Sequence, residues 1–415
     1  MADWYEAIAG NVIYQAALYF FAIYPIFFSL VWVITSIIYY LRREHAGDGG
    51  FYDIDEQPMV SVLIPAYFEE RNIAGTVEHA LELNYPNYEV IVIDDGSRDR
   101  TWEEVRQFLG NPGLRVIRKE QNEGKAMAIN DAIPAANGSI IVIIDADAKV
   151  HPDFLKYIVP HFVRLPRVAG ITGNPRVTNT GSLIAKIQAV EFSSIIAILR
   201  RAQTVWGRIL TVSGVVSAFR KSAVLDVGLF DPDMATEDIA MSWKLQKRFY
   251  DVRYEPRAMA DMEVPDTVMG LWRQRRRWAK GLSQVLRRNK DVLSHYKYRR
   301  LWAVYLEAAL SIVWAYCLVI LTIFWVISYS AGFQPLGAAP IPNWWGMLIA
   351  TFSITQLLTG VLLARRYDTK IGWFFLWSVL YPIGYWIYMS IITVVSTPAG
   401  FFLKSQGPTR WRSVR

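Results

Sequence analysis

Apolar residues gather in long runs at both ends of the chain, and the first run lies near the N-terminus. Residues 14–41 are nearly all apolar and are followed at once by Arg42 and Arg43. A membrane-spanning helix needs roughly 20 apolar residues, and basic residues beside it favour the cytoplasmic side. A cleaved signal peptide is the rival interpretation, but the run is too long and lacks a basic start and a small-residue cleavage site. We therefore expect a retained anchor helix, followed by a cytoplasmic region.

The pattern changes between about residues 59 and 265, where short β-branched runs alternate with helix-like segments and polar turns. The apolar runs are residues 60–64, 90–93, 116–117 and 140–144. This alternation predicts an α/β domain around a mostly parallel sheet. Ligands bind at the carboxyl ends of the strands in such sheets. Three polar stretches directly follow strands and are therefore candidates for a functional site: residues 65–70, 94–97 and 145–147.

The tail of the chain is again apolar, with three segments at residues 302–329, 344–364 and 371–395. Trp and Tyr near several of their ends suit a membrane interface. Three full crossings would leave the C-terminus outside, whereas the basic residues after position 403 favour the inside. Pro382 and Gly384 interrupt the last segment, so we expect a broken or re-entrant helix there.

Composition supports a partly membrane-embedded chain, because 53% of the 415 residues are hydrophobic. The formal charge of +7 and the pI of about 9.3 raise the question of nucleic acid. No recognised nucleic-acid motif is present, and basic flanks beside apolar segments explain the charge, so no nucleic-acid partner is expected. The single Cys317 lies in an apolar run, which excludes a disulfide framework and a cysteine metal site.

Two carboxylates, Asp145 and Asp147, lie one residue apart at a predicted strand end. On an extended chain they point to the same side, which suits a hard divalent cation that also bridges phosphate oxygens. An acidic turn that caps the next helix is the alternative. Asp94 and Asp95 also follow a strand, and they either bind a base or ribose or form a turn with an N-cap. Lys125 begins another helix and either reaches a diphosphate or is a solvated helix start.

Residues 236–238, Thr-Glu-Asp, precede a helix-like segment, so Thr236 or Asp238 could cap that helix. The other interpretation is catalytic. A base that deprotonates an acceptor hydroxyl must be a carboxylate or imidazole near the donor carbon, and Asp238 would serve if the fold brings it beside Asp147. The histidines form no spaced cluster, which gives little support to a histidine metal site or a Ser-His triad.

Residues 271–278 are both basic and aromatic and lie where the polar region meets the apolar tail. Gln274, Arg277 and Trp278 fall at i, i+3 and i+4, on one helix face. This face could lie on an anionic membrane surface, or Arg277 could neutralise a departing diphosphate while Trp278 offers a flat platform to a sugar ring. The two interpretations are compatible. The other arginines, at positions 273, 275 and 276, are expected to point in other directions, some towards lipid headgroups.

Taken together, the ordered set of Asp94-Asp95, Asp145-x-Asp147, Thr236-Glu237-Asp238 and Gln274-x-x-Arg277-Trp278 resembles the signature of processive family 2 glycosyltransferases, the group of cellulose, chitin and hyaluronan synthases. Longer stretches are similar to the bacterial poly-β-1,6-N-acetylglucosamine synthases: MATEDIAMSWKLQ at 234–246, YEPRA at 254–258, PDTVMGLWRQRRRWAKG at 265–281 and TRWR at 409–412. Phe68 is a departure, because many relatives have Asn there.

The resemblance implies a cytoplasmic α/β domain of the GT-A fold, a Rossmann-like nucleotide-sugar-binding fold, inserted between transmembrane helices. It implies Asp238 as the general base, and Asp147 with Asp145 as ligands of Mg²⁺ or Mn²⁺. The substrate-binding residues that it implies are Ala66, Tyr67, Glu69, Asp94, Asp95, Lys125, Asp145, Glu237, Gln274, Arg277 and Trp278. The expected domains are an anchor helix (1–45), the catalytic domain (46–268), amphipathic interfacial helices (269–300), transmembrane helices that form a channel (301–398) and a basic tail (399–415).

The activity that the resemblance implies is inverting, processive transfer of N-acetylglucosamine from UDP-GlcNAc into poly-β-1,6-GlcNAc, with export of the growing polysaccharide through the lipid bilayer of a bacterial cytoplasmic (inner) membrane. Chitin, hyaluronan or cellulose synthesis and single transfer to a lipid are alternatives, because the motifs do not fix the linkage. A non-catalytic membrane subunit is a third interpretation. Gram-negative members work with a small accessory membrane subunit and respond to cyclic di-GMP, so the resemblance adds both as candidate partners, with cyclic di-GMP bound at an interface.

Overall fold

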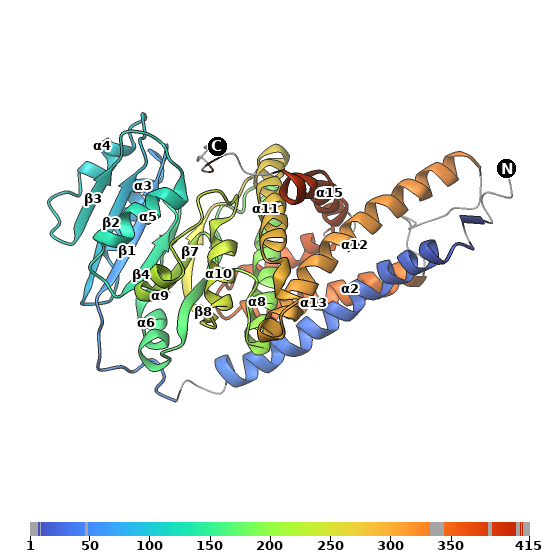
Figure 1. The fold of residues 1–415 in the computed structure, drawn as a ribbon, viewed down its shortest axis with the longest axis horizontal. Helices are drawn as coiled ribbons and strands as arrows, with labels where there is room; N and C mark the ends of the chain where they lie inside the picture. Colours follow the sequence, from blue (N-terminus) through green and yellow to red (C-terminus); the bar gives the residue numbers. More distant parts are fainter. Residues whose placement is uncertain are drawn as a thin grey trace.

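The computed structural model describes residues 7–8, 10–45, 49–332, 344–380, 384–403, 407 and 409. An α/β domain forms one end of the molecule and long apolar helices form the other (Figure 1). The basic residues Lys404, Arg410, Arg412 and Arg415 and the predicted helix breaker Pro382 lie outside the described residues.

Within the described residues, eight strands form one mixed sheet in the order β3-β2-β1-β4-β7-β6-β8-β5. The strands are β1 (Val60–Ala66), β2 (Tyr88–Asp94), β3 (Leu114–Arg118), β4 (Ile140–Ile144), β5 (Lys149–Val150), β6 (Val168–Val177), β7 (Val216–Arg220) and β8 (Asp251–Met262). The half from β3 to β4 is parallel, as predicted. Strand β7 is antiparallel to both β4 and β6, and β5 is antiparallel to β8, so the second half is mixed.

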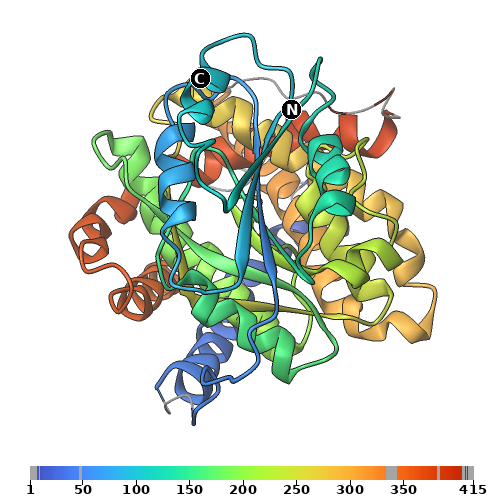
Figure 2. The ribbon, with the colours of Figure 1, turned by 90° about the vertical axis from the view of Figure 1, so that its left-hand side faces the viewer.

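Helices cover both faces of the sheet, and this explains why β1, β2 and β4 are rich in Val and Ile at successive positions. On one face Ile73 of α3 and Phe154 of α6 belong to the apolar core, and on the other Ile129 of α5 and Leu245 of α10 do. Figure 2 shows α3 and α5 on opposite sides of the sheet. The helices of this domain are α3 (Ile73–Leu81), α4 (Thr101–Arg106), α5 (Lys125–Ala135), α6 (Phe154–Arg164), α7 (Leu183–Glu191), α8 (Ala197–Trp206), α9 (Lys221–Asp226) and α10 (Glu237–Lys247), with a π-helical turn at Phe192–Ile196 between α7 and α8.

The parallel strands end at the same edge of the sheet. Ala66, the last residue of β1, pairs with Asp94, the last residue of β2. Strand β4 ends beside them at Ile144 and leads directly into Asp145. The three polar stretches that were predicted to form a site therefore meet at one edge.

Three helices among the described residues are long and apolar enough to cross a membrane: Val12–His45, Tyr296–Ser330 and Gly346–Ala364. They comprise α2 (Val12–Tyr39) with the π-helical turn Tyr40–His45, the short 3-10 turn Tyr296–Tyr298 with α12 (Arg299–Ser330), and most of α13 (Trp344–Ala364). These spans indicate a membrane protein.

The last apolar segment is interrupted, in agreement with the expectation from Gly384. It consists of α14 (Ile371–Phe374), a 3-10 turn at Phe375–Leu380 and the shorter apolar helix α15 (Trp386–Phe402). Between the domain and the spans lie α11 (Val268–Arg288) and another 3-10 turn at Lys290–Val292. Whether the interrupted segment crosses the membrane stays a prediction.

A buried ion pair joins the first span to the α/β domain. Glu44, directly after α2, lies 2.7 Å from the guanidinium of Arg201 on α8, and both side chains are 1% exposed. Tyr367 donates its hydroxyl to the same carboxylate at 2.7 Å, and Arg366 donates to the Glu44 carbonyl at 2.6 Å. Both residues follow α13, so the ends of two spans and the catalytic domain share one buried polar contact.

Candidate active site

Lys125 lies at the centre of the candidate site. It is the first residue of α5, directly after Gly124, whose φ of +96° suits glycine. The ammonium is 2.5 Å from an Asp145 carboxylate oxygen and 3.3 Å from one of Glu237, and it donates to the Gly214 carbonyl at 2.9 Å. Burial lowers the pKa of Lys125, but these two carboxylates and Asp238 outweigh it and hold that pKa above its usual range. Lys125 thus stays charged and connects three separate segments.

Asp238 and Glu237 begin α10 and belong to the same cluster of charges. Burial, together with the negative charge of Glu237, raises the pKa of Asp238 to about 6, although Lys125 and Arg277 oppose the shift. Burial raises the pKa of Glu237, but the positive charges of Lys125 and Arg277 lower it by more, so that this pKa stays below its usual value. The two adjacent carboxylates therefore differ: Glu237 is fixed as an anion, whereas Asp238 can exchange a proton near neutral pH.

The alternative role of this segment as a helix cap is only partly realised. Thr236 occupies the N-cap position of α10 but makes no capping hydrogen bond with its side chain. Asp238 accepts the backbone N–H of Ile239 at 2.9 Å with one carboxylate oxygen. A single accepted N–H leaves the second oxygen of Asp238 able to accept a proton or a hydroxyl.

Helix α11 is fixed directly against this segment. A Cβ added at Gly281 would lie 2.1 Å from the Thr236 hydroxyl oxygen, so the helix backbone and the Thr236 side chain are in contact. Gln284, one turn further on, accepts the backbone N–H of Ala235 at 3.0 Å. Sequence reasoning missed both residues, although a glycine inside a helical pattern is a signal of close packing.

The predicted face of α11 reaches the charge cluster. Arg277 is exposed, and its charge influences both Glu237 and Asp238. Gln274 is partly buried, and its side-chain carbonyl oxygen is buried without a hydrogen-bond partner in the described part of the chain. A buried acceptor of this kind favours a donor group from a ligand.

The remaining arginines of α11 point in different directions, as expected, and Arg275 faces the protein interior. Arg273 and Arg276 are exposed, but Arg275 is buried and lies 2.6 Å from the Glu191 carboxylate. Its guanidinium also stacks over the Trp278 ring, 4.1 Å from the ring centre. Tyr385, before α15, donates its hydroxyl to Glu191 at 2.8 Å. Arg275 therefore holds Trp278, and the sequence offered no signal for a partner 84 positions away.

Asp94 and Asp95 are fully buried at the end of β2. Asp94 accepts the backbone N–H of Ser97, and Asp95 accepts those of Glu123 and Gly124 at 3.2 and 2.8 Å. The turn-and-cap geometry is thus present, and through it Asp95 fixes the loop that carries Lys125. Binding of a base or ribose stays a prediction. Both Asp95 oxygens and one Asp94 oxygen already accept hydrogen bonds, whereas the other Asp94 oxygen has no hydrogen-bond partner in the described part of the chain.

The remaining predicted nucleotide contacts lie beside this loop. Ala66 is buried, whereas Tyr67 and Glu69 are partly exposed after β1. Glu69 is held by its backbone N–H, which donates to Thr101 at 2.8 Å. Phe68 has φ of +56°, a left-handed conformation that Asn tolerates better than Phe, so this departure from the family pattern adds strain.

Asp145 and Asp147 supply oxygen donors of the kind that a hard divalent cation prefers. Asp145 is 24% exposed in its side chain, and Asp147 is partly exposed in the next turn. The searched, described residues contain no group of three or more His, Cys, Asp or Glu that could hold a metal. Two carboxylates still fit Mg²⁺ or Mn²⁺, since these ions commonly take their other ligands from substrate phosphates and water.

Comparisons with known proteins agree with this geometry. Residues 61–228 match the sequence profile of glycosyl transferase family 2. Poly-beta-1,6-N-acetyl-D-glucosamine synthase of Staphylococcus epidermidis is 36% identical over 402 residues, which cover 95% of this chain and 97% of that protein. The synthase of the same name from Staphylococcus aureus strain COL is 35% identical, with the same coverage.

A solved structure supports the fold. The mannosyltransferase PcManGT from Pyrobaculum calidifontis, in complex with GDP-Man and Mn²⁺, superposes with a TM-score of 0.63 at 21% identity and covers 92% of this chain and 98% of its own. The GT-A prediction is therefore confirmed, and a structural relative of this fold holds Mn²⁺. The chain belongs to glycosyl transferase family 2 and is a homologue of the poly-β-1,6-N-acetyl-D-glucosamine synthases, with candidate membrane spans on both sides of its GT-A domain.

Proposed function

We propose that the protein polymerises N-acetylglucosamine from UDP-GlcNAc into poly-β-1,6-GlcNAc at the cytoplasmic face of a bacterial cytoplasmic membrane. Identity of 36% over nearly the whole length of a synthase supports the substrate and the product. The observation that carries the chemistry is Asp238, a carboxyl with a pKa of about 6 within reach of the charges of Lys125 and Arg277. A general base works best with a pKa near the working pH.

In this proposal the nucleotide lies across the strand ends. Ala66, Tyr67, Glu69 and the Asp94-Asp95 turn hold the uridine. The ammonium of Lys125 pairs with Asp145 and Glu237 and also attracts the negatively charged diphosphate. Mg²⁺ or Mn²⁺ held by Asp147 and Asp145 would neutralise the diphosphate when bound.

Asp238 then accepts the proton of the acceptor C6 hydroxyl, and the hydroxyl oxygen attacks the anomeric carbon from the face opposite the departing UDP. A single base without a covalent enzyme intermediate accounts for inversion. Arg277 is exposed and free to approach the leaving diphosphate, whose negative charge grows as the bond breaks. Glu237 stays ionised beside it and balances the positive charge of Lys125 between turnovers.

The acceptor end of the polymer lies along α11. Trp278 is locked by Arg275 and offers a rigid ring on which a sugar can stack. The unpaired, buried carbonyl oxygen of Gln274 can accept a hydroxyl from the same sugar. Because every unit of a homopolymer presents the same ring and hydroxyl groups, each new acceptor unit can make both contacts, which suits repeated addition.

The route of export has support from a cavity among the apolar helices. A space of about 220 Å³ lies between α11, α12 and α15. Trp314 and Trp386 line it together with the hydroxyls of Ser311, Ser390 and Thr393. Aromatic faces and hydroxyls are the groups that bind sugars weakly and let them slide. The accessory membrane subunit, and cyclic di-GMP at its interface, stay predictions from the family resemblance.

Product analysis tests the proposal. Membranes that contain the protein are incubated with UDP-GlcNAc and a divalent cation, and the polymer is treated with a 1,6-specific hexosaminidase or with chitinase. We expect cleavage only by the first enzyme. A product cut by chitinase, or a single sugar on a lipid, would contradict the proposed linkage or the polymerisation. Asp238→Asn should bind UDP normally and make no polymer, so full output from that variant would remove the proposed base.

A further inference from the structure

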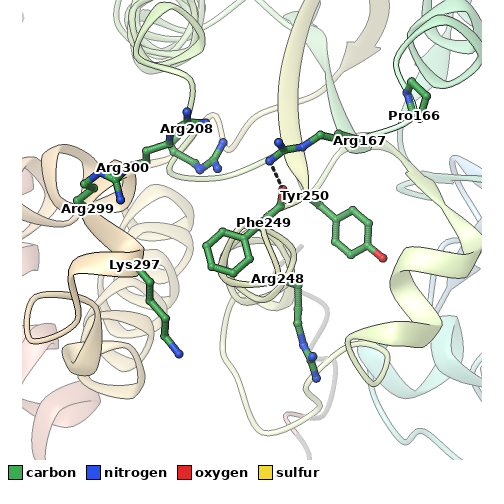
Figure 3. Close-up of a pocket in the computed structure, with 9 residues that line it drawn as sticks. All are labelled: Pro166, Arg167, Arg208, Arg248, Phe249, Tyr250, Lys297, Arg299 and Arg300. Carbon is green, nitrogen blue, oxygen red and sulfur yellow. Dashed lines mark hydrogen bonds between the residues drawn. The ribbon is translucent and has the colours of Figure 1, made fainter.

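A second cavity, of about 630 Å³, lies at the opposite end of α10 from the active-site charge cluster and has no part in the proposed reaction. Four segments form it: the turn after α6, the turn after α8, the turn after α10 and the start of the span that includes α12 (Figure 3). The nine described residues that line it include six cations and no acidic residue: Pro166, Arg167, Arg208, Arg248, Phe249, Tyr250, Lys297, Arg299 and Arg300.

Part of this positive charge is buried. Arg208 is 3% exposed and lies 3.0 Å from the Asp251 carboxylate, which is also 3.9 Å from Arg167. Burial lowers the pKa of the Arg208 guanidinium, Asp251 partly restores it, and the positive charges of Arg300 and Arg167 lower it further. One carboxylate thus faces several cations, so the cavity has an excess of positive charge.

The other cations are exposed and have no ion-pair partner. Arg248, Lys297, Arg299 and Arg300 form no salt bridge with any carboxylate that the structure describes. Like charges gathered in this way repel one another, and an anion that enters the cavity removes the repulsion. The cavity is therefore built to hold an anion.

The position of the cavity identifies the source of the anion. Lys297, Arg299 and Arg300 begin the span Tyr296–Ser330, whose first strongly exposed apolar side chain after them is Leu306. Leu306 lies six positions after Arg300 along the helix, a rise of about 9 Å. That distance is close to the thickness of the headgroup layer, roughly 6 Å on each side of the hydrocarbon. The cations thus lie at the level of lipid phosphates.

Aromatic side chains at the rim suit the same environment. Phe249 is 48% exposed and has φ of +66°, a strained conformation that is rare for a bulky residue. Its ring stacks on Tyr298, with the centres 6.2 Å apart, and Tyr296 beside them is 71% exposed. Exposed aromatic rings next to lysine and arginine are typical of the membrane interface.

We propose that this cavity binds the headgroup phosphate of an anionic phospholipid in the leaflet next to the catalytic domain. The lipid phosphate lies beside Arg299 and Arg300, and its acyl chains follow the exposed apolar surface of α12. The bound lipid links the α/β domain to the bilayer at a point separate from the Glu44–Arg201 contact. It neutralises the cations without entering the catalytic cycle.

The test uses the full-length protein in nanodiscs of neutral phosphatidylcholine with or without phosphatidylglycerol. Native mass spectrometry of the protein released from the mixed nanodiscs measures the retained anionic lipid. We expect the wild type to retain phosphatidylglycerol preferentially. The double variant Arg299→Gln/Arg300→Gln should bind it roughly 30-fold more weakly, because each basic residue near the surface contributes about a fivefold factor.

Arg106→Gln is the matched control, since Arg106 is an exposed arginine on α4, far from α12 (Figure 1). It should retain phosphatidylglycerol as the wild type does. Equal lipid retention by the wild type and the double variant would overturn the proposal. Displacement of the lipid by millimolar inorganic phosphate would also overturn it and indicate a site for a soluble anion. A thermal unfolding profile of the double variant like that of the wild type would confirm that it folds.

Discussion

Helix α11 contacts Thr236 through Gly281, so adding one methyl group at Gly281 tests whether this contact sets the position of the helix. In Gly281→Ala the new Cβ would lie 2.1 Å from the Thr236 hydroxyl oxygen, 2.6 Å from its methyl carbon and 2.8 Å from its Cβ. Rotation of the Thr236 side chain cannot relieve the last of these contacts. Nonbonded carbon atoms settle at about 3.5–4.0 Å, so the contact with the Thr236 Cβ alone requires α11 and the segment before α10 to separate by roughly 1 Å.

That separation acts on catalysis more than on stability. Overpacking costs about 1–3 kcal/mol, and the better helix propensity of Ala returns about 1 kcal/mol. Gln274, Arg277 and Trp278 move with α11 while Asp238 stays with α10. A misplacement of about 1 Å in a reacting pair can cost about 100-fold in rate. We therefore expect kcat to fall about 100-fold, with little change in UDP binding, because the nucleotide contacts lie on the sheet edge.

The assay is the initial rate of GlcNAc transfer in nanodiscs, with UDP affinity measured by calorimetry. Gly181→Ala is the matched control, because a Cβ there meets no atom within 4 Å. Adding Thr236→Ala to Gly281→Ala removes the two shortest contacts and should restore part of the rate. A Gly281→Ala enzyme with wild-type kcat would refute the view that this contact sets the distance between α11 and the base.

Three further predictions concern charge. The transfer rate at limiting substrate should rise with pH through about 6, because Asp238 must be ionised and its pKa is about 6. The raised pKa also means that Asp238 costs the folded state stability as pH rises from about 4 to 6, so the thermal midpoint of Asp238→Asn minus that of the wild type should be larger at pH 8 than at pH 4. Arg275→Lys keeps the charge beside Glu191 but loses the flat stack on Trp278, so the KM for oligosaccharide acceptors should rise about fivefold while that for UDP-GlcNAc stays constant. Glu44→Gln should lower the thermal midpoint by breaking a buried pair worth about 3–5 kcal/mol, whereas Glu56→Gln, at an exposed position, should leave it unchanged.

The sequence predicted the parallel half of the sheet because β1, β2 and β4 are buried on both faces and therefore each contain a short apolar run rich in Val and Ile. Strands β6 and β8 were not predicted, since polar residues interrupt or alternate with their apolar ones. The sequence also did not predict that β7 lies antiparallel between β4 and β6, because strand order depends on pairings between distant segments.

The same distinction applies to the candidate site. Helical spacing placed Gln274, Arg277 and Trp278 on one face, and the structure brings Arg277 close enough to influence Asp238. Spacing could not reveal that Arg275 is buried against Glu191, because the sequence does not show which distant carboxylate a helix meets. Local periodicity therefore predicts which side chains share a face, and only the tertiary structure shows what that face contacts.

The Glu44–Arg201 pair limits how the enzyme can move during polymer extension. Separating two side chains that are each 1% exposed leaves an unpaired charge in the interior, at a cost near 4 kcal/mol. Only about one molecule in a thousand would have the pair open at any moment. Any rocking of the α/β domain on its first span that separates this pair is therefore confined to a minor population. Movements that leave the pair closed, such as those of side chains on α11, carry no such cost.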